Sequence, residues 1–161
     1  MHIDRLERYW IIAVTAMLGV FMAALFVSVV VFRVQLPSPV GRVDPRALAE
    51  TEFATPGLTD LGASRYDMHI VAKMWNFDLG QAKGEPAEVR LPRGAQVTFF
   101  VTSEDVTHGF FIEGHDANLM LLPGQIASTT VRFNRPGTYH IICHEYCGPA
   151  HANMVAAIIV E

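Results

Sequence analysis

One long run of apolar residues stands near the start of the chain. Residues 10–32 carry no charged side chain, and most of them are Val, Ala, Ile, Leu, Met and Phe. At a rise of about 1.5 Å per residue, a helix of this length extends about 35 Å, enough to cross a hydrocarbon core of about 30 Å. A cleaved signal peptide would have a shorter apolar region that ends in small residues, whereas this run ends in Val-Phe-Arg. The pattern therefore predicts a short tail over residues 1–9 and a retained transmembrane helix over residues 10–33.

A connector follows this apolar run. Proline and glycine recur throughout residues 34–65, which is typical of a linker. Within it, Asp44 and Pro45 suit the N-cap and first position of a short helix that would reach about Phe53.

From residue 66 onward, short runs of β-type residues alternate with turn signals. The runs cover residues 66–77, 87–91, 96–102, 109–113, 118–122, 127–133, 138–143 and 155–160. Many short strands at close spacing, with no helical stretch between them, predict an antiparallel sandwich or barrel. Residues 66–161 have the length of one such domain. The expected fold is therefore mainly β, with one N-terminal transmembrane helix.

Charge narrows the classes of function. The formal net charge is −4, and no basic patch is available to neutralise phosphates, so a nucleic-acid-binding role is excluded. A mildly acidic domain could attract a basic partner protein, although an ordinary soluble surface has the same composition.

The chemistry is concentrated near the C-terminus. Cys143, Cys147, His151 and Met154 follow the pattern C-x3-C-x3-H-x2-M, and the two cysteines are the only ones in the chain. Thiolate, imidazole and thioether together form a soft donor set that suits copper. The four residues lie in a turn-rich loop after a predicted strand, where a rigid sheet can present a site.

Other kinds of site could also explain this pattern of residues. A structural zinc site normally has four Cys or His ligands and no Met. A disulfide is possible in an oxidising compartment, but a thioredoxin-like pair would have two intervening residues and not three. A mononuclear blue-copper site uses one Cys, two His and a weak axial Met, so the second Cys would be surplus.

Two thiolates on one loop can instead bridge two copper ions, each completed by one His. The second His must then come from elsewhere in the chain. His140 would point away from Cys143 by strand parity, and His144 directly follows Cys143. We prefer His108, at the end of a strand, with His115 in a predicted solvent loop as the runner-up.

The loop C-x-E-x-C-G-x-x-H-x-x-M resembles the dinuclear copper A loop of cytochrome c oxidase subunit II. The segment Asp105-Val106-Thr107-His108 is similar to that family's D-V-x-H, and Leu122-Pro123-Gly124 and Pro136-Gly137-Thr138-Tyr139 fall where the family has L-P-G and P-G-x-Y. The resemblance runs from about residue 66 to residue 161. A single helix and a short head domain resemble the B-type branch of the haem–copper oxidases.

The resemblance implies a cupredoxin-like Greek-key fold and a ligand set. Cys143 and Cys147 would bridge both coppers, His108 and Met154 would complete one ion, and His151 with the backbone carbonyl of Glu145 would complete the other. In the wider family this Glu side chain can also reach a magnesium ion. Trp75 and Phe77 fall near the aromatic segment through which electrons enter, although both could equally be ordinary core or edge aromatics.

The implied function is electron transfer in a terminal oxidase. Single electrons would pass from a cytochrome c-type donor to the copper pair and on to haem in subunit I, where oxygen is reduced and protons are pumped. The copper domain would face the outer, periplasmic side of a prokaryotic cell membrane. Alternatives are a copper A module of nitrous oxide reductase or nitric oxide reductase, a membrane-tethered metallochaperone, and a structural β domain with a Cys143–Cys147 disulfide.

Overall fold

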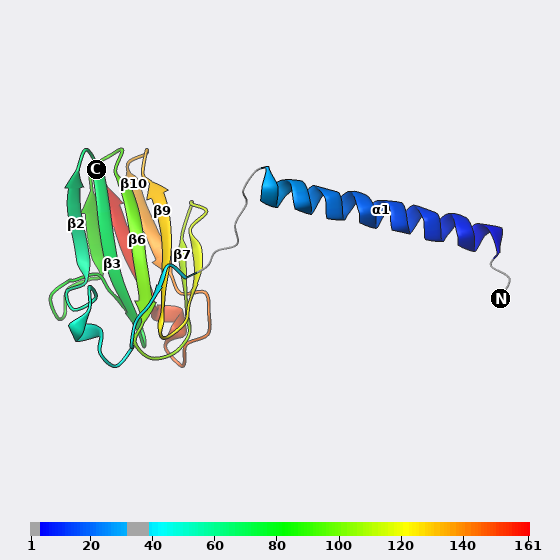
Figure 1. Ribbon diagram of the computed structural model, residues 1–161. Helices are drawn as coiled ribbons and strands as arrows, with labels where there is room; N and C mark the ends of the chain where they lie inside the picture. Colours follow the sequence, from blue (N-terminus) through cyan, green and yellow to red (C-terminus); the bar gives the residue numbers. More distant parts are fainter. Residues whose placement is uncertain (1–3, 32–38) are drawn as a thin grey trace. The chain divides into compact units, whose positions relative to one another are not determined.

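The computed structural model describes residues 4–31 and 39–161. The chain divides into an N-terminal helical unit and a β unit, Pro37–Glu161 (Figure 1). Residues 32 and 33, which end the predicted transmembrane segment, lie outside the described residues. The same holds for residues 1–3 of the predicted tail and residues 34–38 of the predicted linker.

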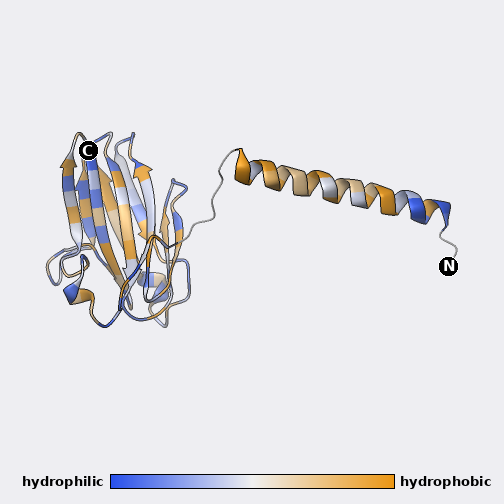
Figure 2. Ribbon diagram, viewed as in Figure 1, coloured by the Kyte–Doolittle hydropathy of each residue, from blue (hydrophilic) through white to orange (hydrophobic). Residues whose placement is uncertain are grey.

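The first unit contains helix α1, Arg5–Val30. Its 26 residues extend about 39 Å, and the helix is long and apolar enough to cross a membrane. It begins before the uncharged run because Asp4 caps it: the Asp4 carboxylate accepts a hydrogen bond from the backbone N–H of Leu6 at 2.8 Å. Figure 2 shows the polar first turn and the predominantly hydrophobic remainder.

Within residues 39–161, the β unit has eleven strands in two sheets. The strands are β1 (Gly41–Arg42), β2 (Gly57–Gly62), β3 (Arg65–Lys73), β4 (Asn76–Asp78), β5 (Glu88–Leu91), β6 (Gln96–Ser103), β7 (His108–Ile112), β8 (Asn118–Leu121), β9 (Gln125–Arg132), β10 (Gly137–Ile142) and β11 (Val155–Val160). One sheet has the order β1-β9-β6-β3-β2, with β4 paired to β3, and the other has the order β5-β11-β10-β7-β8.

The core lies between the two sheets. Alternate residues of β6 and β11 are buried, as expected where one face of each strand packs inward. The largest side chains in this core include Phe99, Phe110 and Phe133; the ring of Phe99 contacts Phe110 in a tilted arrangement and Phe133 edge-on. The predicted fold class, mainly β and cupredoxin-like with one N-terminal apolar helix, is confirmed.

The expectation of purely antiparallel pairing is wrong. Strand β3 pairs parallel with β6, and β5 pairs parallel with β11. The alternation of apolar and polar residues along a strand indicates which face of that strand is buried. It carries no information about the direction of the neighbouring strand. In addition, the predicted strand over residues 66–77 is split into β3 and β4 by a turn at Met74 and Trp75.

The predicted linker contributes to the sheet as well. Strands β1 and β2 lie within residues 34–65, and the helix expected after Asp44 is only a 3-10 turn, Leu48–Glu50. Leu48 and Phe53 pack with Val71 and Ile126 in a second, smaller core. The chain gains more by burying these apolar side chains against the sheet than by completing one short helix.

Three loops meet at one end of the sandwich. Antiparallel pairing of Ile142 with Phe111 places the start of β7 beside the residues that follow β10. Strands β10 and β11 are neighbours joined by residues 143–154, which we call the metal loop. Parallel pairing of Ala72 with Ser103 brings the β3–β4 turn beside the β6–β7 loop. Segments far apart in the sequence therefore converge there.

Candidate metal centre

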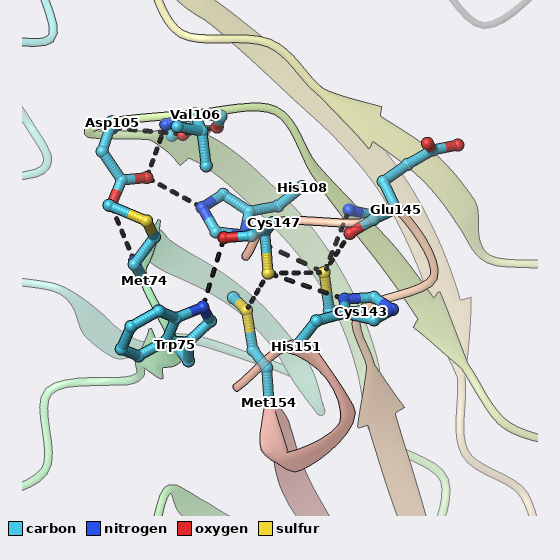
Figure 3. A network of polar contacts seen from close by, with 12 residues as sticks. Met74, Trp75, Asp105, Val106, His108, Cys143, Glu145, Cys147, His151 and Met154 are labelled. Carbon is cyan, nitrogen blue, oxygen red and sulfur yellow. Dashed lines mark hydrogen bonds and ion pairs between the residues drawn. The ribbon is translucent and has the colours of Figure 1, made fainter. Parts of the chain in front are cut away.

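Two cysteine sulfurs form the middle of the site. Cys143 and Cys147 are free and buried, at 4% and 3% exposure, and their Sγ atoms lie 3.8 Å apart. A disulfide bond is about 2.05 Å long, so this separation is that of two independent sulfur ligands. Figure 3 shows them between the side chains of His108, His151 and Met154.

His108 approaches from the first residue of β7. Its side chain is fully buried, and Nδ1 lies 3.8 Å from the Cys143 sulfur. On the far side of the ring, Nε2 lies 2.8 Å from the Asp105 carboxylate. The sulfurs of both cysteines and a nitrogen of His108 all lie within 4.8 Å of one another, close enough to share a metal ion.

The metal loop itself supplies the other donors. His151 Nδ1 and Met154 Sδ lie 3.6 Å and 3.7 Å from the Cys147 sulfur. The backbone carbonyl oxygen of Glu145 lies 3.2 Å from the Cys143 sulfur. Its carboxylate points away from the sulfurs (Figure 3) and lies 3.8 Å from His144 Nδ1. All six predicted ligand residues are therefore gathered in one place.

The remaining histidines contact other parts of the β unit. His115, the runner-up, follows the other end of β7 and packs against Phe133 and Tyr139. His140 lies 2.9 Å from the Glu113 carboxylate, and His69 stacks on Phe100. The structure agrees with the preference for His108, because His108 begins β7 beside the sulfurs and His115 follows the opposite end of that strand.

A glycine allows the metal loop to approach β7. The backbone N–H of Gly109 donates to the Cys143 sulfur at 3.4 Å. A Cβ atom at Gly109 would lie 2.6 Å from Cγ of His144 and 2.7 Å from its backbone nitrogen. His144 is therefore a packing residue on the back of the loop, and the absence of a side chain at position 109 sets the distance between the loop and His108.

The two predicted aromatic residues occupy different environments. Trp75 is 39% exposed, and its indole N–H donates to the backbone carbonyl of Cys147 at 3.2 Å. Phe77 is fully buried in the core and packs edge-on against Phe110. Of these two aromatics, Trp75 is the one that is partly exposed and contacts the metal loop.

Asp105 lies beside His108, with a role that the sequence pattern does not reveal. Its carboxylate lies 2.8 Å from His108 Nε2 and accepts hydrogen bonds from the backbone N–H groups of Met74 and Val106 at 2.7 Å and 2.6 Å. Partial burial raises the pKa of this carboxyl, but these hydrogen bonds outweigh burial and bring the pKa below its usual value. The sequence signal that could have indicated this contact is an acidic residue three positions before a candidate ligand.

Burial has the opposite effect on Cys147. Removal from water, together with the contact with Cys143, raises the pKa of the Cys147 thiol to about 11. A neutral thiol is thus the stable form in the absence of metal, and a metal ion must displace its proton to bind.

The donor set fits copper. Two thiolates, two imidazole nitrogens, one thioether and one carbonyl oxygen are mostly soft ligands, and a thioether is typical of copper sites. The rigid strands on either side hold these donors in place. Such a site can accept and release single electrons with little movement of its ligands.

Comparisons with known proteins identify relatives. Residues 52–161 match the family described as cytochrome c oxidase subunit II, periplasmic domain. Cytochrome c oxidase subunit 2 of Thermus thermophilus is 34% identical, over 96% of this chain and 91% of that protein. A chain in the cryo-EM structure of a heme-copper terminal oxidase dimer superposes with a TM-score of 0.75 and 34% identity, covering 98% of this chain and all of the other.

A more distant likeness involves another enzyme. Nitrous-oxide reductase of Ralstonia nicotianae is 36% identical over 78 residues, which is 46% of this chain but only 12% of that protein. The similarity is restricted to a shared module, so it does not support a reductase function for the whole chain.

Gly109→Ala should disrupt the centre. The added methyl group meets the His144 backbone, which cannot move without shifting the metal loop, so we expect a loss of about 1–3 kcal/mol in stability and of most copper binding. Denaturation followed by near-ultraviolet circular dichroism, with copper analysis, measures both. The control is Gly19→Ala in α1, where no atom lies within 4 Å of the added Cβ. Normal stability and copper content in Gly109→Ala would show that this close approach is not required.

Proposed function

Because the chain belongs to the cytochrome c oxidase subunit II family, we propose that its six gathered residues hold a dinuclear copper centre that relays electrons. The chain is a subunit of a haem–copper terminal oxidase, an oxidoreductase complex, and is membrane-anchored. Copper binding follows from the family. The number of ions, the ligands and the redox partners are the proposal.

The observation that carries the proposal is the separation of the two sulfurs. Half of 3.8 Å is about 1.9 Å, which is less than the length of a metal–thiolate bond, about 2.3 Å for zinc. An ion bonded to both sulfurs would therefore lie off the line that joins them. A second ion could bond to the same two thiolates from the opposite side of that line.

The other donors are numerous enough for two ions. Following the family pattern, we assign His108 and Met154 to one ion and His151 and the Glu145 carbonyl oxygen to the other. Each ion would then have two thiolates, one imidazole and one further donor. All four donors lie 3.2–3.8 Å from one or the other sulfur, which supports two ions at this pair of thiolates; the division of the donors between the ions follows the family pattern alone.

Copper held in this way supplies one-electron redox chemistry. The chain's own residues keep water away from the sulfurs, since Cys143, Cys147 and Met154 are at most 4% exposed. The strands on either side fix the donor positions, which limits rearrangement when the charge changes. The apolar surroundings and the weak thioether donor tune the reduction potential.

We further propose that electrons from a cytochrome c-type donor enter through Trp75. This residue is partly exposed and is hydrogen-bonded to the carbonyl of a bridging cysteine. The buried position of Phe77 favours the core role that the sequence also allowed for it. From the copper pair, electrons would pass to haem in subunit I, which reduces oxygen and pumps protons.

The proposed location is a prokaryotic cell membrane that α1 crosses once, with the β unit on the periplasmic side. The apolar length of α1 and the family's description as a periplasmic domain support this orientation. A magnesium ion at Glu145 has less support. One carboxylate supplies too few of the oxygen ligands that magnesium needs, so subunit I would have to provide others.

Metal analysis of the full-length chain in detergent tests the dinuclear centre. We expect two coppers per chain in the wild type and loss of both in Cys147→Ser, because each thiolate serves both ions. His140→Asn, which removes an imidazole outside the centre, should keep two. One copper per wild-type chain would defeat the proposal.

Trp75→Phe in the assembled oxidase tests the route of electrons. The change keeps an aromatic ring but removes the indole N–H that binds the Cys147 carbonyl. We expect stopped-flow oxidation of reduced cytochrome c to slow several-fold at unchanged copper content, whereas Trp10→Phe in α1 should have no effect. An unaltered rate in Trp75→Phe would place the route elsewhere.

A further inference from the structure

Asp105 connects two parts of the chain that meet at the metal centre. It lies in the β6–β7 loop, three residues before His108, and its two carboxylate oxygens have different partners. Oδ1 lies 2.8 Å from His108 Nε2, and Oδ2 accepts the backbone N–H of Met74 at 2.7 Å. Figure 3 shows the carboxylate between the ring of His108 and the turn that carries Trp75.

The loop holds this carboxylate in place through its own hydrogen bonds. The hydroxyl of Ser103, which is fully buried, donates to the carbonyl of Val106 and accepts the backbone N–H of Asp105 at 3.3 Å. The backbone N–H of Val106 donates to Oδ1 of Asp105 at 2.6 Å. The orientation of Asp105 is therefore set before any metal binds.

The first consequence concerns the proton on His108. An ionised carboxylate can only accept hydrogen bonds, so Nε2 must carry the proton of a neutral ring. Nδ1 then has its lone pair free on the side that faces the Cys143 sulfur, 3.8 Å away. The opposite tautomer would direct an N–H at the position of a metal ion and could not bind it.

The second consequence concerns the other side of the centre. By accepting the N–H of Met74, Asp105 holds the β3–β4 turn whose next residue is Trp75. The Trp75 indole donates to the Cys147 carbonyl and lies over Gly148, where an added Cβ would come within 3.0 Å of the indole nitrogen. One carboxylate thus holds a histidine ligand directly, and it holds the metal loop indirectly through the β3–β4 turn.

We infer that Asp105 is a positioning residue of the copper centre. It holds His108 as the Nε2–H tautomer with Nδ1 directed at the sulfurs, and it fixes the β3–β4 turn against the metal loop. This inference rests on the proposed function only in taking His108 as a copper ligand. The state of the His108 ring in metal-free protein is independent of copper.

The test uses Asp105→Asn in the full-length chain in detergent, with Glu104→Gln as the control. An amide has nearly the same shape but only one acceptor oxygen, so it cannot satisfy both His108 and Met74. Glu104 is the exposed neighbour, and its substitution removes the same charge. Nitrogen-15 NMR of metal-free protein reports the His108 tautomer, and competition with a chelator reports copper affinity.

Wild type and Glu104→Gln should show the Nε2–H form of His108. Asp105→Asn should show the Nδ1–H form or a mixture, together with a 10- to 100-fold loss of copper affinity, the size expected for the partner of a metal-binding histidine. An unchanged tautomer and affinity in Asp105→Asn, or an equal loss in Glu104→Gln, would overturn the inference.

The wild type alone keeps the inference testable if Asp105→Asn does not fold. Nδ1–H in the metal-free wild type would refute it directly. Failure of the proposed function gives a different result: the Nε2–H form would be present, yet the chain would not bind two coppers.

Discussion

The metal centre depends on two buried sulfur atoms that are held 3.8 Å apart at one end of a rigid sandwich. The metal loop that carries them joins two neighbouring antiparallel strands, so both of its ends are fixed by hydrogen-bonded backbone. The close approach at Gly109 then sets the distance to His108 on β7. Donors from strand β7 and the metal loop converge because the sheet brings them together and not because they are adjacent in sequence.

Burial makes the thiolate form of these cysteines costly without a metal ion. A thiolate removed from water is disfavoured, which is why the Cys147 thiol has a pKa of about 11. Bonds to a soft cation offset that cost, so the same desolvation that suppresses the free thiolate favours the metal-bound form. For the neighbouring carboxyl of Asp105 burial also raises the pKa, but the contact with His108 and the hydrogen bonds from the backbone N–H groups of Met74 and Val106 bring it below its usual value.

Local pattern was sufficient to predict the apolar helix, most strands and the soft ligands in the metal loop. Their information lies within short stretches: an uncharged run, alternating burial and the spacing of Cys, His and Met. It did not reveal that β3 and β6 are parallel or that residues before position 66 complete the sheet. Nor did it reveal the contacts of Asp105 with Met74 and of Trp75 with Cys147, which join residues 31 and 72 positions apart. Such contacts depend on how strands are paired, which no local pattern encodes.

Electron paramagnetic resonance of the oxidised, copper-loaded full-length chain tests the central claim most directly. Two thiolates shared by two ions should spread one unpaired electron equally over both copper nuclei and split the signal into seven hyperfine lines. A four-line signal would confine the electron to one nucleus and contradict the account, whatever the total copper content.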